Sequence, residues 1–358
     1  MTAREFEGRS VLFLTPCFLA RRLHKEIRGV EVFDLLLLRG LHELGIRVTV
    51  GAEITWRSRL EAHLAGAMPE VVYTPSLIKP FWNGLALRPR LLGRRFDALL
   101  VGNVGNGLGL TVRSLRRRCG HTALIAHRGP KPAFLRALRG RPTDIVAVND
   151  AIAAEFNPSP ERRVTVRYGI PNADRFFPDE AAHPSDGKTR FVVIGRLDTR
   201  MKRVDRAIAA FERLPEDVRA ACELHLAGYP EPPRDLPRGV IAYGWQTVDQ
   251  IAALLRRMDV CLIPSDPGET FSQAMVQAML SGLPSIVSDL PPLVEKTQRN
   301  AGLVARTDDE LLHAMTRLAR NVQERRAMGR AARELALERY VWDTAWFARE
   351  HLFPRRPA

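Results

Sequence analysis

Residues 259–289 read DVCLIPSDPGETFSQAMVQAMLSGLPSIVSD, and this stretch indicates the fold of the chain most clearly. Val260–Pro264 is an apolar run of strand length, and the Ser-Asp-Pro-Gly that follows is turn chemistry. Apolar side chains then recur at helical spacing over residues 271–280. Gly282 and Pro284 end that helix before a second short apolar run. The stretch therefore predicts a strand–loop–helix–strand unit of a parallel sheet.

The start of this helix is a candidate ligand site. Thr270 is expected to cap the helix, with Gln273 completing a capping box three residues later. Free backbone N–H groups and about half a positive charge at a helix start favour an anion such as phosphate. Glu269 would repel phosphate but could hold a polyol, so a nucleotide sugar would satisfy both groups. The alternative is that Glu269 only complements the helix dipole.

The same stretch resembles the donor-binding segment of the group 1 retaining glycosyltransferases, which have the GT-B fold. That family usually carries two glutamates eight positions apart, then Ala-Met and a Gly-x-Pro turn. The matching residues here are Glu269, Ala278, Met279, Gly282 and Pro284. Gln277 stands in place of the second glutamate, which departs from the family pattern.

A second motif, GRLDTRMKRVD, covers residues 195–205 and is similar to the family's Gly-Arg-Leu segment. Arg196 at the end of a predicted strand and Lys202 at the next helix start could reach one diphosphate beyond the strands. Arginine binds phosphate through two parallel N–H groups, and lysine adds a mobile charge. The alternative is a pair of solvated loop residues.

The first half predicts a similar βαβ beginning. An apolar run at residues 10–15 leads through a loop to a helix from about Val30 to Leu44. Gly29, Val30 and Glu31 resemble the family's Gly-Gly-Val-Glu, although Arg28 replaces the first glycine. Gly29 is otherwise an ordinary loop-to-helix glycine.

His127 follows the predicted strand Thr122–Ala126. Family members commonly have a histidine after the equivalent strand, near the transferred sugar, so the resemblance implies an active-site role for His127. A histidine that only bonds backbone at a strand end is the alternative.

Composition sets broad limits. The 358 residues are enough for two domains, and 46% hydrophobic with 26% charged residues is ordinary for a globular protein. Four scattered cysteines without CxxC spacing argue against a zinc site or disulfide framework and favour a reducing cytoplasm. The N-terminal sequence MTAREFEGRS lacks a signal-peptide pattern, and no apolar run approaches the ~20 residues of a membrane span.

The net charge of +14 lies mostly in the first half, where residues 1–180 hold 28 Lys+Arg against 17 Asp+Glu. Residues 71–96 contain no acid but five basic residues: Lys79, Arg88, Arg90, Arg94 and Arg95. These stand beside Tyr73, Phe81 and Trp82, a mixture that suits an anionic membrane surface. The alternative is that the aromatic rings pack inward and the arginines are solvated.

We expect an α/β protein with two Rossmann-like, doubly wound domains, the GT-B arrangement. The expected bounds are residues 1–178 for an acceptor-side domain and 179–340 for a nucleotide-sugar domain. Residues 341–358 are expected to form a C-terminal helix that crosses back to the first domain. Residues 164–188, rich in Pro, Asp, Asn and Gly, are expected to connect the domains.

The resemblance implies a retaining hexosyltransferase acting on a nucleotide-diphosphate sugar and a glycan or lipid-linked acceptor, in cell-envelope polysaccharide or glycolipid synthesis. The implied catalytic residues are His127, Arg196, Lys202 and Glu269. The implied donor-binding residues are Gly29, Gly195, Phe271, Ser272, Gln273 and Gln277, with Gln277 at the ribose.

No Asp-x-Asp occurs in the chain, so we expect neither a metal clamp nor another cofactor. The expected location is the cytoplasm, peripheral on the inner face of the membrane, without nucleic acid as a partner. Two alternatives remain, a GT-B sugar-nucleotide epimerase and a catalytically degenerate donor-binding or membrane-associated scaffold.

Overall fold

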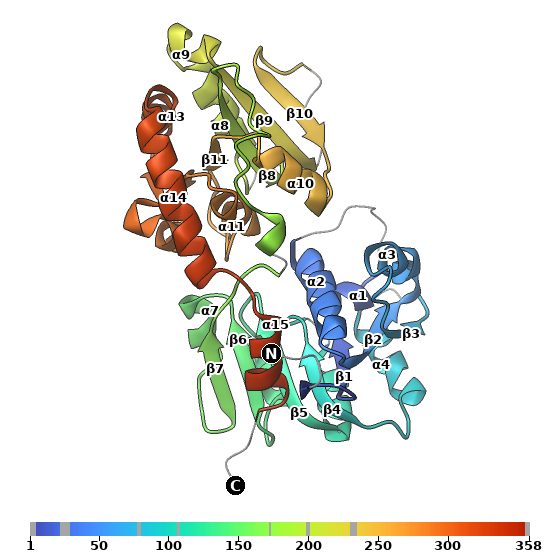
Figure 1. The fold of residues 1–358 in the computed structure, drawn as a ribbon. Helices are drawn as coiled ribbons and strands as arrows, with labels where there is room; N and C mark the ends of the chain where they lie inside the picture. Colours follow the sequence, from blue (N-terminus) through green and yellow to red (C-terminus); the bar gives the residue numbers. More distant parts are fainter. Residues whose placement is uncertain are drawn as a thin grey trace. The chain divides into compact units, whose positions relative to one another are not determined.

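The computed structural model describes residues 5–21, 29–76, 80–105, 108–171, 173–197, 201–229 and 235–354. The chain divides into two compact units (Figure 1). Unit 1 comprises Met1–Pro171 and Trp342–Ala358, and unit 2 comprises Asn172–Val341. Each unit contains one parallel sheet, which confirms the expected α/β class.

The described strands of unit 1 form a seven-stranded sheet in the order β3-β2-β1-β4-β5-β6-β7. All of its neighbouring strands pair in parallel. The strands are β1 (Ser10–Leu14), β2 (Arg47–Glu53), β3 (Glu70–Thr74), β4 (Phe96–Val101), β5 (Cys119–Ala126), β6 (Thr143–Ala147) and β7 (Arg162–Val166). The strand order reverses between β1 and β4, which makes that edge the topological switch point of unit 1.

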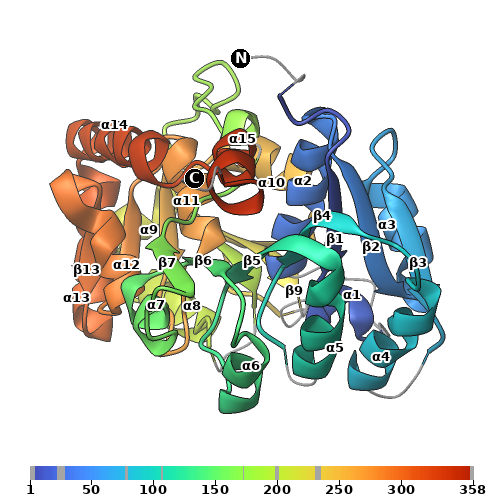
Figure 2. The same ribbon diagram turned by 90° about the horizontal axis from the view of Figure 1, so that it is seen from below.

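Helices cover this sheet because each presents an apolar face to it. The helix α2, for example, buries Phe33, Leu37 and Leu41 at helical spacing. Helices α4 and α5 lie side by side, as Figure 2 shows. The α-helices of unit 1 are α1 (Pro16–Leu19), α2 (Gly29–Glu43), α3 (Arg57–His63), α4 (Pro80–Arg90), α5 (Leu108–Leu115), α6 (Pro132–Ala137), α7 (Asp150–Glu155) and α15 (Thr344–Phe347). Short 3₁₀ turns at Ile54–Trp56 and Arg116–Arg118 and a π turn at Ala348–Leu352 complete the unit.

The described strands of unit 2 form a six-stranded parallel sheet in the order β10-β9-β8-β11-β12-β13. They are β8 (Thr189–Arg196), β9 (Cys222–Tyr229), β10 (Val240–Gly244), β11 (Val260–Ile263), β12 (Ser285–Ser288) and β13 (Gly302–Ala305). Here the order reverses between β8 and β11, the strands that precede the two predicted donor motifs.

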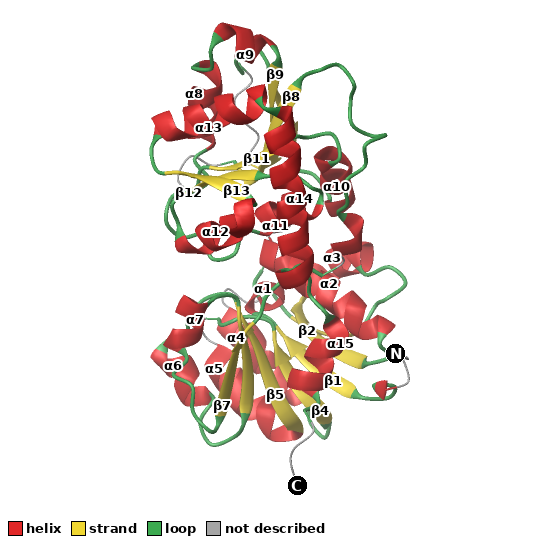
Figure 3. Cartoon of the chain, turned by 60° about the vertical axis from the view of Figure 1, so that its left-hand side comes forward, coloured by secondary structure: helices red, strands yellow, loops and turns green. Residues whose placement is uncertain are grey.

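The core of unit 2 joins this sheet to amphipathic helices through buried side chains such as Phe191, Phe211 and Met315. The long helix α14 packs along α11, as Figure 3 shows. The α-helices are α8 (Val204–Glu212), α9 (Glu216–Ala220), α10 (Val248–Leu255), α11 (Gln273–Leu280), α12 (Pro291–Val294), α13 (Asp308–Arg320) and α14 (Val322–Arg339). The 3₁₀ turns are Ala173–Arg175 and Glu295–Asn300.

One close backbone approach explains a glycine in this sheet. Gly228 on β9 pairs in register with Gly195 on β8. A Cβ added to Gly228 would lie 1.7 Å from the carbonyl oxygen of Gly195, so only glycine fits. The two strands therefore end close together at the edge where Gly195 lies.

Candidate functional site

The two predicted donor motifs meet at the switch point of unit 2. Strand β8 ends with Gly195 and Arg196, and strand β11, its neighbour in the sheet, leads to the loop that carries Glu269. In open α/β sheets, ligands bind beyond the carboxyl ends of the strands at such a point. Arg196 is exposed at this edge.

Contacts between the two loops hold the site together. The Lys202 ammonium forms an ion pair with the Glu269 carboxylate, and both side chains are nearly buried, with 13% and 11% exposed. The backbone N–H of Asp266 donates to the carbonyl oxygen of Met201 over 2.8 Å. Arg203 also contacts the Asp266 carboxylate at 3.2 Å. Residues 198–200, the middle of the Gly-Arg-Leu loop, lie outside the described residues.

Positive φ angles occur around this edge at Gly195 (124°), Arg203 (46°), Gly268 (126°) and Ser272 (61°), among others. Glycine adopts such angles freely, whereas Arg203 and Ser272 store strain of order 1 kcal/mol each. Strained backbone of this kind clusters at ligand sites.

The expected capping box at Thr270 is wrong. Helix α11 begins at Gln273, and its N-cap is Ser272 in the left-handed conformation, without a side-chain capping bond. The reason is that Phe271 turns inward to pack against Tyr340, with 6.0 Å between ring centroids. The left-handed turn at Ser272 then redirects the chain into the helix. Ser272 Oγ is buried and makes no hydrogen bond among the described residues.

The other predicted donor residues lie on or beside α11. Phe271 is 5% exposed, so its ring belongs to the core of unit 2. Gln273 and Gln277 are half-buried, one helical turn apart on the same helix. The helix otherwise buries both of its apolar sides, as expected.

In unit 1, Gly29 is the first residue of α2, and His127 directly follows β5. The residue before Gly29, the substituted Arg28, lies outside the described residues. The His127 ring is 8% exposed and packs edge-on against Phe33 (5.4 Å) and Tyr168 (5.0 Å). Its Nε2 has no hydrogen-bond partner within the described ranges.

Burial in this aromatic cluster lowers the pKa of His127 to about 3, because the charged imidazolium would lose its hydration. The imidazole is therefore neutral at physiological pH. A neutral histidine can donate or accept a hydrogen bond but does not act as a general acid.

Asp34 is a residue that sequence reasoning missed. It lies on α2 beside the β1–β4 switch point, fully buried, and accepts a 2.8 Å hydrogen bond from Thr15 Oγ1. Burial raises the pKa of its carboxyl well above the usual range. A single polar residue in the apolar face of a helix is the only sequence signal that could have drawn attention to it.

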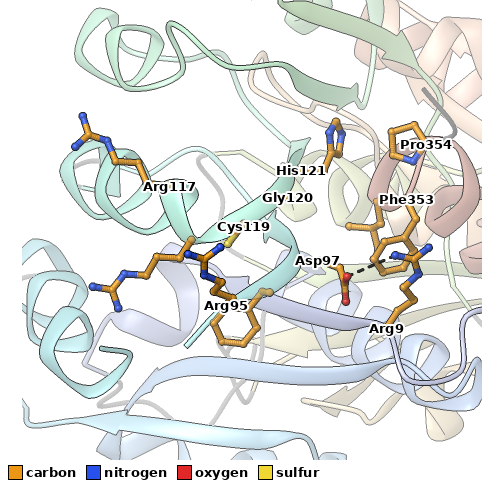
Figure 4. Close-up of a pocket in the computed structure, with 12 residues that line it drawn as sticks. Arg9, Arg95, Asp97, Arg117, Cys119, Gly120, His121, Phe353 and Pro354 are labelled. Atoms are coloured by element: carbon orange, nitrogen blue, oxygen red, sulfur yellow. Dashed lines mark hydrogen bonds and ion pairs between the residues drawn. The ribbon is translucent and has the colours of Figure 1, made fainter. Parts of the chain in front are cut away.

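A separate cavity of about 460 Å³ opens in unit 1, at the amino-terminal ends of strands β4 and β5 (Figure 4). Arg95 and Cys119 lie on one side of it, and Arg9, paired with Asp97 at 3.4 Å, lies on the other beside Phe353. None of the predicted site residues lines this cavity. It is therefore not the site that the motifs define.

Among the described residues, no group of three His, Cys, Asp or Glu side chains could hold a metal ion. Within the same ranges no helix is both long and apolar enough to cross a bilayer.

Comparisons with known proteins agree with this geometry. Residues 188–321 match the family model described as glycosyl transferases group 1. This segment of the chain is similar to the group 1 glycosyl transferases. The match covers Arg196 at the end of β8, Lys202 in the loop that follows it, and Glu269 in the loop between β11 and α11. The resemblance stated from the motifs is thereby confirmed.

Solved structures extend the likeness to nearly the whole chain. Alr3699/HepE from Anabaena, solved with UDP and glucose, is 16% identical, with a TM-score of 0.68 over 95% of this chain and 97% of that one. A sucrose-phosphate synthase from Thermosynechococcus elongatus is 17% identical, with a TM-score of 0.71 over 93% and 95%. WaaG, a glycosyltransferase involved in lipopolysaccharide biosynthesis, is 17% identical, with a TM-score of 0.65 over 91% and 95%. At this identity the likeness establishes the GT-B fold. No curated protein sequence matches the chain.

Proposed function

We propose that this protein is a retaining glycosyltransferase that transfers a hexose from a UDP-sugar to a glycan or lipid-linked acceptor. The observation that carries the proposal is the Lys202–Glu269 pair beside Arg196 at the switch point of unit 2. Two cations and one carboxylate at this edge are the groups that a ligand with a diphosphate and a polyol would need, which supports the proposal.

The donor assignment is supported by the structural relative HepE, which has been solved with UDP-glucose. Arg196 and Lys202 are the cations that contact the diphosphate, and Glu269 accepts hydrogen bonds from the sugar hydroxyls. Gln277 binds the ribose. In unit 2, the backbone at Gly195 and residues Phe271, Ser272 and Gln273 surround the phosphates and the sugar. In unit 1, Gly29 is the proposed donor-binding residue.

In the proposed reaction, the bond between the anomeric carbon and the diphosphate oxygen breaks while an acceptor hydroxyl attacks from the same face. The acceptor proton passes to the departing phosphate oxygen, so the reaction needs no protein nucleophile. Arg196, Lys202 and the start of α11 stabilise the negative charge that develops on the diphosphate. His127, neutral because it is buried, supplies a hydrogen bond and not a proton.

Two structural relatives and the charge of the first half support the proposed acceptor and cellular setting. The structural relative WaaG is described as involved in lipopolysaccharide biosynthesis, and WaaB as a lipopolysaccharide outer core galactosyltransferase. The first half of this chain is also strongly basic. We place the acceptor in cell-envelope polysaccharide or glycolipid synthesis, and the enzyme in the cytoplasm at the inner membrane face.

The test of the donor assignment is a thermal-shift panel of UDP-glucose, UDP-galactose, UDP-N-acetylglucosamine and GDP-mannose, followed by assays of sugar transfer and donor hydrolysis. A UDP-sugar should raise the melting temperature most and should be turned over. Binding without transfer or hydrolysis would support the scaffold alternative. No stabilisation by any UDP-sugar would contradict the proposal.

Metal independence rests on Arg196 and Lys202 as the cations at the diphosphate. Transfer should therefore persist in excess EDTA. If EDTA abolishes transfer and Mn²⁺ or Mg²⁺ restores it, a metal ion stabilises the leaving group and the assignment of the two side chains is wrong.

A further inference from the structure

Lys296 is fully buried, with 0% of its side chain exposed, and no motif accounts for it. It lies in the 3₁₀ turn Glu295–Asn300 that follows α12. Lysine is almost never buried to this extent without partners, because its ammonium must give up its hydration.

Each side of the Lys296 ammonium meets a group that stabilises positive charge. Its Nζ donates to the carbonyl oxygen of Pro292 over 2.6 Å and to Glu295 Oε1 over 2.5 Å. The same Nζ lies 4.7 Å from the ring centroid of Phe271 and 4.9 Å from that of Tyr340. Two hydrogen bonds and two aromatic rings hold the lysine in its charged form. Burial still lowers its pKa, opposed by the nearby charges of Glu295 and Glu269.

These contacts reach the proposed donor site through Phe271. The ring that lies over the Lys296 ammonium belongs to the residue two positions after Glu269, immediately before the strained Ser272. Lys296 therefore restrains the loop that carries Glu269. Its charge also acts on the Glu269 carboxylate through space, although the ion-pair partner of Glu269 is Lys202.

Binding of a diphosphate would change the charge balance around the Glu269 carboxylate. Lys202 would then turn from Glu269 towards the phosphates, and a nearly buried carboxylate would lose its partner. An uncompensated charge at such a position is strongly unfavourable. A second cation near Glu269 reduces this cost, and the candidate is Lys296, whose ammonium lies over the ring of Phe271, two positions after Glu269.

We propose that Lys296 is a positioning residue of the donor site. It anchors the Glu269 loop through Phe271 and balances the Glu269 charge, so that Lys202 is released to the diphosphate while Glu269 binds the sugar. The inference rests on the proposed function, because it assigns Glu269 to the sugar and Lys202 to the phosphates.

The test compares two affinities in each variant, for UDP-glucose and for UDP, measured by isothermal titration calorimetry on the full chain. Lys296→Met keeps the length of the side chain and removes its charge. It should weaken UDP-glucose binding about tenfold more than UDP binding, because only the sugar depends on Glu269. Lys188→Met is the matched control, since Lys188 pairs with Glu223 at 2.6 Å just before β8, at the opposite end of that strand from the motif. It should leave both affinities unchanged.

A double-mutant cycle separates positioning from mere support of the fold. In a Glu269→Gln background, Lys296→Met should no longer change the ratio of the two affinities, because the charge that it balances is gone. The melting temperature should fall, because two hydrogen bonds and two ring contacts of the ammonium are lost, so the readout is the ratio of the two affinities in the folded variant. If Lys296→Met does not fold, Lys296→Gln, which can still donate to Pro292, takes its place in the cycle.

An unchanged ratio in Lys296→Met, or an equal loss of both affinities, would overturn the inference and leave the proposed function standing. The inference is also overturned if Lys296→Met changes the ratio of the two affinities equally in the wild-type background and in the Glu269→Gln background. Failure of the wild-type protein to bind UDP-glucose more tightly than UDP would overturn the inference together with the assignment of Glu269 to the sugar.

Discussion

Glu269 precedes helix α11, and Gln277 lies within it, so the two residues should affect different parts of the reaction. Contacts with the reacting sugar can strengthen in the transition state, whereas contacts with the ribose stay uniform. Glu269→Ala should lower kcat. The transition state should lose roughly 2–3 kcal/mol of stabilisation, the loss expected for a charged hydrogen bond. Gln277→Ala should mainly raise the donor KM, by about tenfold.

Steady-state kinetics with varied donor concentration measures both effects. Glu269→Gln serves as the control that keeps the side-chain shape while removing the charge. If Gln277→Ala leaves the donor KM unchanged, Gln277 is only a polar residue on the helix and does not bind the ribose.

His127 should make the protein sensitive to acid. Its folded-state pKa of about 3 lies below the unfolded value of about 6.5, so the unfolded state binds more protons between these limits. Stability that is present above pH 6.5 is therefore lost progressively as the pH falls towards 3. From pH 6.5 to pH 5 the loss is about 2 kcal/mol, at ~1.4 kcal/mol per pH unit.

Urea unfolding at several pH values tests this, with His127→Phe as the comparison. Phenylalanine fits the aromatic cluster but does not titrate, so the variant should lose less stability between pH 6.5 and pH 5. Parallel stability curves for the two proteins would show that His127 is not the cause.

At the scale of the element, the start of α11 combines a left-handed residue with a buried, unpaired hydroxyl. Ser272→Gly should remove both the strained left-handed conformation and the unpaired hydroxyl. Glycine gives the unfolded state more backbone entropy, and once this cost is subtracted the variant should be more stable by about 1 kcal/mol. Donor binding should weaken, because the same hydroxyl is proposed to contact the donor. A gain in stability with a loss of donor binding is the stability–function trade-off that is common at functional sites.

Chemical denaturation and donor titration measure the two changes. Ser288→Gly is the matched control, because Ser288 is buried in strand β12 without a positive φ. It should destabilise the protein. A loss of stability in Ser272→Gly would mean that the left-handed turn depends on contacts of the serine side chain.

At the scale of the whole molecule, the basic first half predicts attraction to anionic surfaces. On and after α4, Trp82 is 54% exposed and Leu92 is 66% exposed. Arg88, Arg90 and Arg95 are exposed nearby, whereas Arg94 is paired with Glu70. Lys79 lies outside the described residues. The alternative in which both aromatic rings pack inward is therefore wrong for Trp82.

We expect the protein to sediment with anionic vesicles but not with zwitterionic ones, and salt should weaken the binding. Each basic residue near the surface contributes about 1 kcal/mol, screened beyond ~10 Å at moderate salt. Trp82→Ala should reduce binding, whereas Trp245→Ala, which changes a 39% exposed tryptophan of unit 2, should not. Equal binding to both vesicle types, or to neither, would contradict the prediction.

The sequence by itself determined which long segments are helices and which are strands, through the spacing of their apolar residues. It also determined that the motifs lie at the carboxyl-terminal edge of a sheet. Strands such as β1, β8 and β11 are continuous apolar runs because both sheet faces are covered, and α2 follows the helical period. Arg196 ends one such run and Glu269 lies in the loop after another, so both had to lie at the carboxyl ends of strands.

The short strands β3, β7 and β13 were not predicted, because their few residues alternate weakly and are only half-buried. Strand β7 occupies the beginning of the segment 164–188 that was expected to be a connection. Pairing with a neighbouring strand, and not local propensity, makes these residues extended.

Only the tertiary structure decided which distant residues meet. The order of the strands puts β8 beside β11, and this brings Lys202 to Glu269 across 67 positions of sequence. It also buries Lys296 beneath Phe271 and Asp34 beneath the edge of the other sheet. Burial and charge pairing depend on every neighbour that the fold supplies. For Asp34, the sequence showed a polar residue in an apolar helix face but not its burial.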